Sequence, residues 1–361
     1  MNIVYTTDEA FTAKVAAGIC SVFENNKEME QINVYIVGQN LSETSCKRFE
    51  KIAEKYKRNI FIIPLGKIED YLDFEYDTGG WNAIVLARLF LEKLLPETVE
   101  KVIYLDGDTI NIGSLKKMWN TDMHEKVVGA CIEATISSVN KKILHMENIP
   151  YVNAGVLLID LKLWREQAVG RKILQFYCKN NGKLPANDQD AINGTLKENI
   201  YYLKPEYNFY NIYWFYPYKV LKKLMGNTEY YSKNIVENAK KHPIIIHYLG
   251  EERPWRAGNH HPYKSDYYRY LRLTPWKDEK DEEGWKIYFI LWDIFNFVMK
   301  PFPEVRYKII NSLIPQFYEM EKKTDKKRKI IINKGENNMY DDIVKYIPYG
   351  RENAISRDDL A

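Results

Sequence analysis

Two carboxylates one residue apart are the most informative feature of the sequence. Asp106 and Asp108 flank Gly107 and directly follow Lys101–Leu105, an apolar run that indicates a short buried strand. The glycine lets the backbone turn tightly, so both carboxylates can bind one hard divalent cation and leave positions for water and phosphate oxygens. Such triplets also arise by chance, as in Asp188–Asp190, and the alternative is a solvated turn that caps a strand. Ligands of open α/β sheets bind beyond the carboxyl ends of strands, which favours a cation site at the first pair.

Strand-like and helix-like segments alternate over the first 110 residues, and further strand-like segments follow. The patterns predict strands at 2–7, 32–37, 60–63, 101–105, 127–132 and 155–159, and helices at 14–23, 42–56 and 83–95. Ser42 is the expected N-cap of the second helix, and Pro64 and Pro96 are expected to end the third strand and the third helix. This alternation predicts an α/β fold with helices on both faces of a mostly parallel sheet.

No glycine-rich phosphate loop accompanies these elements. The sequence has neither Gly-x-Gly-x-x-Gly after the first strand nor Gly-x-x-x-x-Gly-Lys-Ser/Thr anywhere. Dinucleotide-binding and P-loop folds are therefore disfavoured, which leaves a cation as the natural means of neutralising a diphosphate.

Length and composition exclude several classes of partner. The 361 residues suffice for one large domain with additions, and a net charge of +3 gives no overall field for nucleic acid. Four dispersed cysteines without a Cys-x-x-Cys pair indicate reduced thiols: Cys20, Cys46, Cys131 and Cys178. Neither a signal peptide nor a run of ~18 apolar residues is visible, so we expect a cytoplasmic protein.

Five segments, in order along the chain, resemble the retaining glycosyltransferases of family 8, which include lipopolysaccharide galactosyl- and glucosyltransferases and glycogenin. They are Asn2–Asp8, Tyr104–Asp108, Val152–Asp160, Asn187–Asp190 and His247–Trp255. The resemblance extends from Met1 to about Trp276, about three quarters of the chain. It implies a GT-A type fold, in which a Rossmann-like mixed α/β sheet is flanked by helices, with a helical C-terminal extension.

The resemblance implies a cation held by Asp106, Asp108 and His247. Imidazole is a poor ligand for Mg²⁺, so this set suits Mn²⁺ somewhat better. Taken alone, His247 would be an ordinary histidine that ends a buried strand at 244–246, but the continuation through Gly250, Arg253 and Trp255 favours the metal role.

The resemblance also implies how a UDP-sugar is held. Gly250 and Arg253 lie where the family binds the diphosphate, although the family usually has Lys at Arg253, and Arg88 matches an arginine that reaches donor oxygens. Arg presents a planar fork rather than a point charge, so this contact can differ in geometry. Asp8 matches the position that binds the uracil edge, with Thr6 offering backbone contacts and Phe11 a stacking ring. The family often has Asn and Tyr at Ala10 and Phe11, so the details of nucleotide recognition are open.

The remaining matched positions surround the sugar and the reacting carbon. Asn153, Ala154 and Gly155 lie where the family contacts the donor sugar. Asp188 matches a carboxylate that holds sugar hydroxyls, and Gln189 an amide on the face opposite the leaving group. Because a neutral amide is a poor nucleophile, we favour front-face attack over double displacement.

The chain after residue 277 differs in composition. We divide the chain into a catalytic domain at 1–277 and an aromatic, basic and helical extension at 278–361. Trp285, Phe289, Trp292 and Phe295 recur at helical spacing and either pack on the catalytic domain or contact a membrane. We expect them chiefly to pack, since they flank residues expected in the core, such as Ile290 and Leu291. The basic run 322–329 is expected to add weak peripheral affinity for the inner face of the membrane.

The sequence therefore predicts a metal-dependent retaining hexosyltransferase. The donor is UDP-glucose or UDP-galactose, and the acceptor is a lipopolysaccharide-type glycan, another glycan, a lipid-linked saccharide or a glycoprotein. A nucleotide-sugar hydrolase, a nucleotidyltransferase and a catalytically silent sugar-nucleotide-binding protein are the alternatives.

Overall fold

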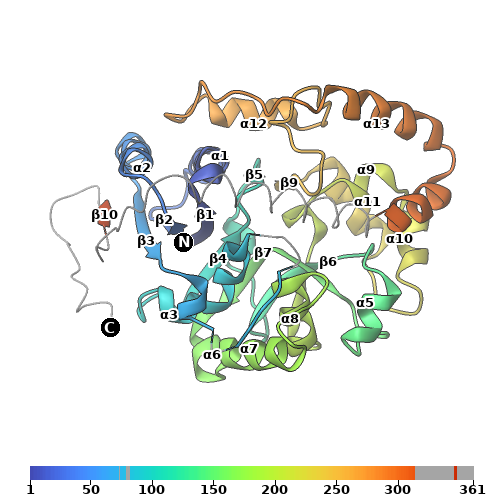
Figure 1. The fold of residues 1–361 in the computed structure, drawn as a ribbon, viewed down its shortest axis with the longest axis horizontal. Helices are drawn as coiled ribbons and strands as arrows, with labels where there is room; N and C mark the ends of the chain where they lie inside the picture. Colours follow the sequence, from blue (N-terminus) through green and yellow to red (C-terminus); the bar gives the residue numbers. More distant parts are fainter. Residues whose placement is uncertain (73, 79–81, 314–344, 348–361) are drawn as a thin grey trace.

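A computed structural model describes residues 1–72, 74–78, 82–313 and 345–347 (Figure 1). Its main sheet has the strand order β10-β3-β2-β1-β4-β7-β6-β8. The strands are β1 (Asn2–Asp8), β2 (Asn33–Gln39), β3 (Asn59–Leu65), β4 (Lys101–Leu105), β6 (Val128–Ile132), β7 (Val152–Asp160), β8 (Ile200–Leu203) and β10 (Lys345–Ile347). The predicted fold class, a mixed sheet flanked by helices, is confirmed.

The sheet is less parallel than the alternating pattern predicted. Strands β1 to β4 are parallel to one another, but β7 runs antiparallel to both β4 and β6, and β10 runs antiparallel to β3. The segment 155–159 lies inside β7 and is buried on both faces. A fully buried strand is a continuous apolar run in either direction, so its pattern cannot reveal its orientation.

Helices cover both faces of the sheet, as Figure 1 shows. In β1, Ile3 and Tyr5 join the apolar cluster under α1 and α2, while Val4 joins the cluster under α6 and α7. Alternate strand residues point to opposite faces, so one strand contributes to two cores. The helices are α1 (Thr12–Asn25), α2 (Glu43–Tyr56), α3 (Leu91–Leu94), α4 (Lys116–Trp119), α5 (Ser138–Ile143), α6 (Leu161–Glu166), α7 (Val169–Lys179), α8 (Asn187–Leu196), α9 (Ile212–Phe215), α10 (Tyr218–Leu224), α11 (Lys233–Lys241), α12 (Lys264–Leu271) and α13 (Lys286–Met299).

Three predicted boundaries can be compared with the structure. Ser42 is the N-cap of α2, and its side chain accepts from the Ser45 N–H. Strand β3 runs to Leu65, so Pro64 does not end it; among the described residues, the pairing with β10 covers Ile60, Phe61 and Ile62 and does not include Pro64. The segment before Pro96 is mainly a 3-10 helix, Ala83–Phe90, followed by the single turn of α3.

A second, two-stranded sheet completes the site. Strand β5 (Thr109–Asn111) follows Asp108 directly and pairs antiparallel with β9 (Ile245–His247), with Thr109 opposite His247. His247 is thus the last residue of a strand rather than the residue after it. Because of this register, the His247 imidazole lies near Asp108 at the end of β4, although more than 130 residues separate the two in sequence.

The C-terminal extension packs on the rest of the molecule through α13. Phe289 is buried, and the indole N–H of Trp292 donates to Glu252 Oε1 at 3.0 Å. The expectation that Ile290 and Leu291 are core residues is wrong, because their side chains are 58% and 61% exposed. The basic run 322–329 lies outside the described residues. Within the described part of the chain, no helix is long and apolar enough to cross a bilayer.

Candidate active site

Three side chains converge beyond the end of β4. One donor atom from each of Asp106, Asp108 and His247 lies within 4.8 Å of the others. His247 Nε2 is 3.1 Å from Asp108 Oδ1 and 3.9 Å from Asp106 Oδ2. Burial disfavours a charged Asp108, yet its pKa is lowered because His247 and Arg253 lie beside it. The predicted metal ligands are therefore brought together.

Two observations fit a cation at this cluster. Nε2 of His247 is buried and points at both carboxylates, as expected of an imidazole nitrogen that shares a cation with them. The space is kept open by Gly155, where a Cβ would collide with the His247 ring and lie 2.7 Å from Asp106 Oδ2. Two carboxylates with one imidazole suit Mn²⁺.

Arg88 contacts both the cation cluster and the predicted sugar site. Its guanidinium lies 2.9 Å from Asp106 Oδ1 and 2.7 Å from Asp188 Oδ2, and it donates to the Ala154 carbonyl at 2.5 Å. It also lies over the Tyr104 ring. Burial opposes the charge of Arg88, yet the two carboxylates hold its pKa above the ordinary value. Arg88 is thus a buried, paired cation between the two acids.

Asp188 and Gln189 lie in the first turn of α8. Burial raises the pKa of Asp188 to about 6, although Arg88 opposes this rise. The carboxamide of Gln189 is held at both ends. Its oxygen accepts from the Ala154 N–H at 2.9 Å, and its nitrogen donates to the Tyr151 hydroxyl at 3.1 Å.

The segment after His247 turns back toward the cluster. Gly250 has φ of +71°, a conformation that favours glycine. Arg253 follows, with a terminal nitrogen 4.0 Å from Asp108 Oδ2. Its guanidinium lies over the Phe11 ring, 6.0 Å from the ring centre. Arg253 and Phe11 thus lie side by side next to the cation cluster.

The predicted uracil-binding residues have protein partners in the structure. Asp8 accepts from the Phe11 N–H through Oδ1 and from the Asn82 amide through Oδ2, at 3.0 and 2.6 Å. The Thr6 hydroxyl is hydrogen-bonded to the Tyr104 hydroxyl at 2.9 Å. The Tyr104 hydroxyl donates in turn to Asp106 Oδ1. Thr6 is thereby linked to the cation cluster.

Several site residues had no usable sequence signal. Glu133 follows β6, and its carboxylate accepts from Asn153 Nδ2 at 3.1 Å. Asn208 is fully buried and contacts both Asn153 and His247. A lone Glu after a strand and an Asn in a loop are too common to single out, so only the fold reveals them.

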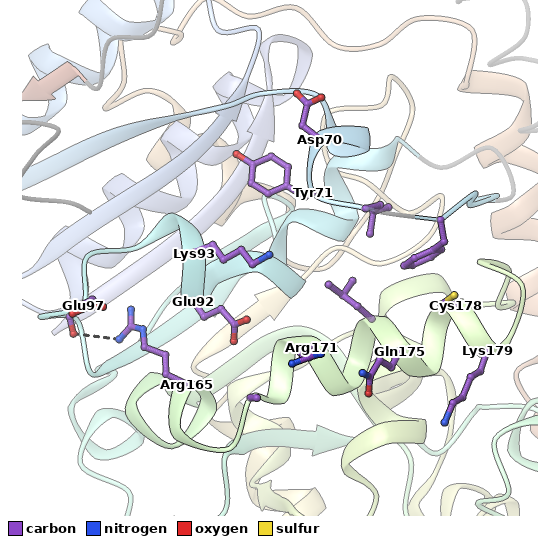
Figure 2. Close-up of a pocket in the computed structure, with 14 residues that line it drawn as sticks. Asp70, Tyr71, Glu92, Lys93, Glu97, Arg165, Arg171, Gln175, Cys178 and Lys179 are labelled. Carbon is purple, nitrogen blue, oxygen red and sulfur yellow. Dashed lines mark hydrogen bonds between the residues drawn. The ribbon is translucent and has the colours of Figure 1, made fainter.

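A hollow lies apart from the cation cluster. A cavity of about 1110 Å³ lies between the segment around Tyr71, α3, α6 and α7 (Figure 2). Its walls mix acids such as Asp70 and Glu92 with bases such as Lys93 and Arg171. None of the predicted site residues lines it, and we assign it no role.

The mixed sheet, with two carboxylates at the end of its central strand, is the architecture of a GT-A type glycosyltransferase. The chain belongs to Glycosyl transferase family 8, whose profile matches residues 2–258.

Two relatives and one solved structure show the range of similarity. Lipopolysaccharide 1,2-glucosyltransferase of Escherichia coli (strain K12) is 26% identical over 291 residues, covering 79% of this chain and 81% of the relative. General stress protein A of Bacillus subtilis (strain 168) is 24% identical, and the match covers 76% of this chain and 94% of the relative. The galactosyltransferase LgtC, solved with donor and acceptor sugar analogs, has a TM-score of 0.63 at 23% identity. The match covers 79% of this chain and 99% of the LgtC chain.

Proposed function

We propose that this protein is a metal-dependent retaining glycosyltransferase that moves glucose or galactose from a UDP-sugar to a glycan or lipopolysaccharide-type acceptor. The observation that carries the proposal is the cluster of Asp106, Asp108 and His247, with Arg253 beside it. Relatives named as lipopolysaccharide glucosyl- and galactosyltransferases support the substrate class.

The main chemical task is to stabilise a diphosphate leaving group. When the bond to the anomeric carbon breaks, two phosphates' worth of negative charge develops on the UDP. A cation held by Asp106, Asp108 and His247 would supply a fixed positive charge there. Arg253 can add a second, because its terminal nitrogen lies 4.0 Å from Asp108 Oδ2, beyond hydrogen-bond distance, and can still donate to a phosphate oxygen.

The carboxamide of Gln189 supports front-face attack. Its oxygen already accepts a backbone N–H, and a neutral amide is in any case a weak nucleophile. A positioned amide dipole can instead stabilise positive charge at the anomeric carbon. We assign to Asp188, which is paired with Arg88, the role of holding the sugar hydroxyls.

The proposal is tested by measuring UDP release from a panel of UDP-sugars with Mn²⁺, with and without glycan acceptors. We expect release from UDP-glucose or UDP-galactose that EDTA abolishes and that an acceptor accelerates. Asp108→Ala should lose at least about a hundredfold in turnover. Release that acceptors never accelerate would indicate a hydrolase, and no UDP binding would indicate that the site does not serve a sugar nucleotide.

We also propose a catalytic domain at 1–277 and an extension at 278–361 that contacts the cytoplasmic face of a membrane. Helix α13 has two apolar faces. One packs on the protein and the other, the outer face, is exposed: Ile287, Ile290, Leu291, Ile294, Phe297 and Val298. These residues are 57% to 81% exposed. A helix that is apolar on its solvent side is typical of contact with a bilayer surface, and the basic run 322–329 adds attraction to anionic lipid.

Vesicle sedimentation tests the membrane proposal. Replacing Ile287, Leu291 and Ile294 by Ser should reduce binding to phosphatidylglycerol-containing vesicles by at least about tenfold, since each buried side chain contributes about 1.5 kcal/mol or more. The matched control replaces Val139 and Ile143, the exposed apolar residues of α5, and should leave binding unchanged. Equal binding by both variants would contradict a membrane role for the outer face.

A further inference from the structure

A chain of buried hydrogen bonds runs from the cation cluster to Glu133. His247 Nδ1 lies 2.9 Å from Asn208 Oδ1, and Asn208 Nδ2 lies 2.8 Å from Asn153 Oδ1. Asn153 Nδ2 lies 3.1 Å from Glu133 Oε2. Asn208, Asn153 and His247 are 0%, 4% and 1% exposed, so water does not compete for these contacts. Four side chains from distant parts of the sequence are thus joined in one line.

The direction of every bond in this line is fixed by one backbone group. The Gly155 N–H donates to one end of the Asn153 carboxamide at 3.0 Å, so that end must be the oxygen. Asn208 contacts the same oxygen and must do so through its NH₂ group. The Asn208 oxygen therefore faces His247, and only a protonated Nδ1 can donate to it.

We infer that Asn208 is a positioning residue of the cation site, which holds His247 as the Nδ1–H form so that Nε2 presents its lone pair to the metal. The inference rests on the proposed function, because it takes the cluster to be a cation site. In this form the lone pair of Nε2 faces the two carboxylate ligands, 3.1 Å from Asp108 Oδ1 and 3.9 Å from Asp106 Oδ2. All donors in the line point away from the imidazole toward the Glu133 carboxylate. Such polarisation makes the imidazole a stronger ligand, as a directly bonded carboxylate does in other metal sites.

The backbone places Asn208 for this task. The 206–209 segment lies beside β9, where the Phe209 N–H donates to the Ile245 carbonyl and the His247 N–H donates to the Phe209 carbonyl, both at 2.9 Å. Asn208 is thereby fixed to the strand that carries His247. The line also changes the role of Asn153: its oxygen accepts two protein donors, so its carboxamide orients the site rather than chiefly binding the sugar.

Nitrogen NMR of the imidazole tests the tautomer directly. At about pH 8 in metal-free protein, the wild type should show the His247 ring protonated at Nδ1, and Asn208→Leu should show a mixture or the Nε2–H form. Asn208→Asp keeps an acceptor for Nδ1–H and should retain the wild-type signature. A wild-type ring protonated at Nε2, or an unchanged signature in Asn208→Leu, would overturn the inference.

Mn²⁺ binding, measured by electron paramagnetic resonance, gives the second readout. Asn208→Leu should bind Mn²⁺ about 10- to 100-fold more weakly, the usual loss when a partner of a metal ligand is removed. The control is Asn26→Leu, which removes another fully buried, hydrogen-bonded amide and should leave Mn²⁺ affinity unchanged. Equal losses in both variants would reduce Asn208 to a folding role. Absence of Mn²⁺ binding by the wild type would overturn the proposed function, whereas the NMR result would still decide the tautomer.

Discussion

Gly155 is the residue at which the main sheet approaches the cation cluster. A Cβ there would overlap the His247 ring and crowd Asp106, neither of which can move without disturbing the ligand set. We expect Gly155→Ala to lower Mn²⁺ affinity and turnover by at least about tenfold, because the ligands would be displaced.

Gly66→Ala is the matched control for this prediction. Among the described atoms, its added methyl group would meet only Asp70 Oδ2, at an ordinary 3.4 Å, so turnover should be unchanged. Mn²⁺ titrations and UDP-release rates for both variants provide the comparison. Wild-type affinity in Gly155→Ala would show that the ligands do not depend on this close approach.

Asp188 provides a prediction about pH. Burial raises its pKa from 3.8 to about 6, so the folded protein binds more protons than the unfolded chain between these values. The stability of the wild type therefore falls as pH rises through this window, and Asp188→Asn escapes the loss. Between about pH 5 and pH 8, the unfolding free energy of the variant should gain about 1 kcal/mol relative to the wild type. Urea unfolding of the metal-free proteins measures the change, and a constant difference would contradict it.

At the scale of elements, the sequence predicts that the aromatic residues of α13 pack, but it does not reveal their partners in the segment after β9. Trp285 lies over the Arg256 guanidinium, 3.6 Å from the ring centre, and Trp292 donates to the buried Glu252. Burial raises the pKa of Glu252, and Trp292 and Asn211 oppose this rise with hydrogen bonds to its carboxylate. The extension thereby supports the residues next to Arg253.

Removing the indole donor should destabilise this contact. Trp292→Phe keeps a ring but leaves one oxygen of Glu252 without its partner, so the unfolding free energy should fall by about 1–3 kcal/mol. Trp285→Phe keeps its ring over Arg256 and should cost less than about 0.5 kcal/mol. Chemical denaturation of the two variants checks the difference, and equal losses would contradict the role of the hydrogen bond.

The sequence allowed most elements to be predicted, but not how they pair. The apolar periods located β1 and α1 within about two residues, because each follows its own local pattern. The antiparallel direction of β7 and the pairing of β5 with β9 depend on contacts across the fold, which local patterns do not encode.

Some residues of the candidate site are likewise predictable from the sequence, and others are not. Asp106 and Asp108 are predictable because one short segment carries both, and resemblance added His247. Glu133 and Asn208 are not predictable, since only the three-dimensional fold gives them their partners.

At the scale of the whole molecule, the cation site and helix α13 both contact the part of the chain formed by β9 and the residues just after it. The strand pair β5–β9 brings the cation ligands together, and the residues just after β9 are held by α13, whose outer face is exposed to solvent. A membrane contact through that face would place the donor site near the bilayer surface, where a lipid-linked acceptor is accessible. The proposed function and the proposed membrane contact therefore involve adjoining parts of the chain.

The most direct test of the central claim is calorimetric titration of the protein with UDP, with and without Mn²⁺. If the cluster of Asp106, Asp108 and His247 holds a cation that binds a diphosphate, Mn²⁺ should tighten UDP binding by at least about tenfold, or ~1.4 kcal/mol. Asp108→Ala should show no such gain. UDP affinity that Mn²⁺ leaves unchanged in the wild type, or a gain that survives in Asp108→Ala, would contradict the account.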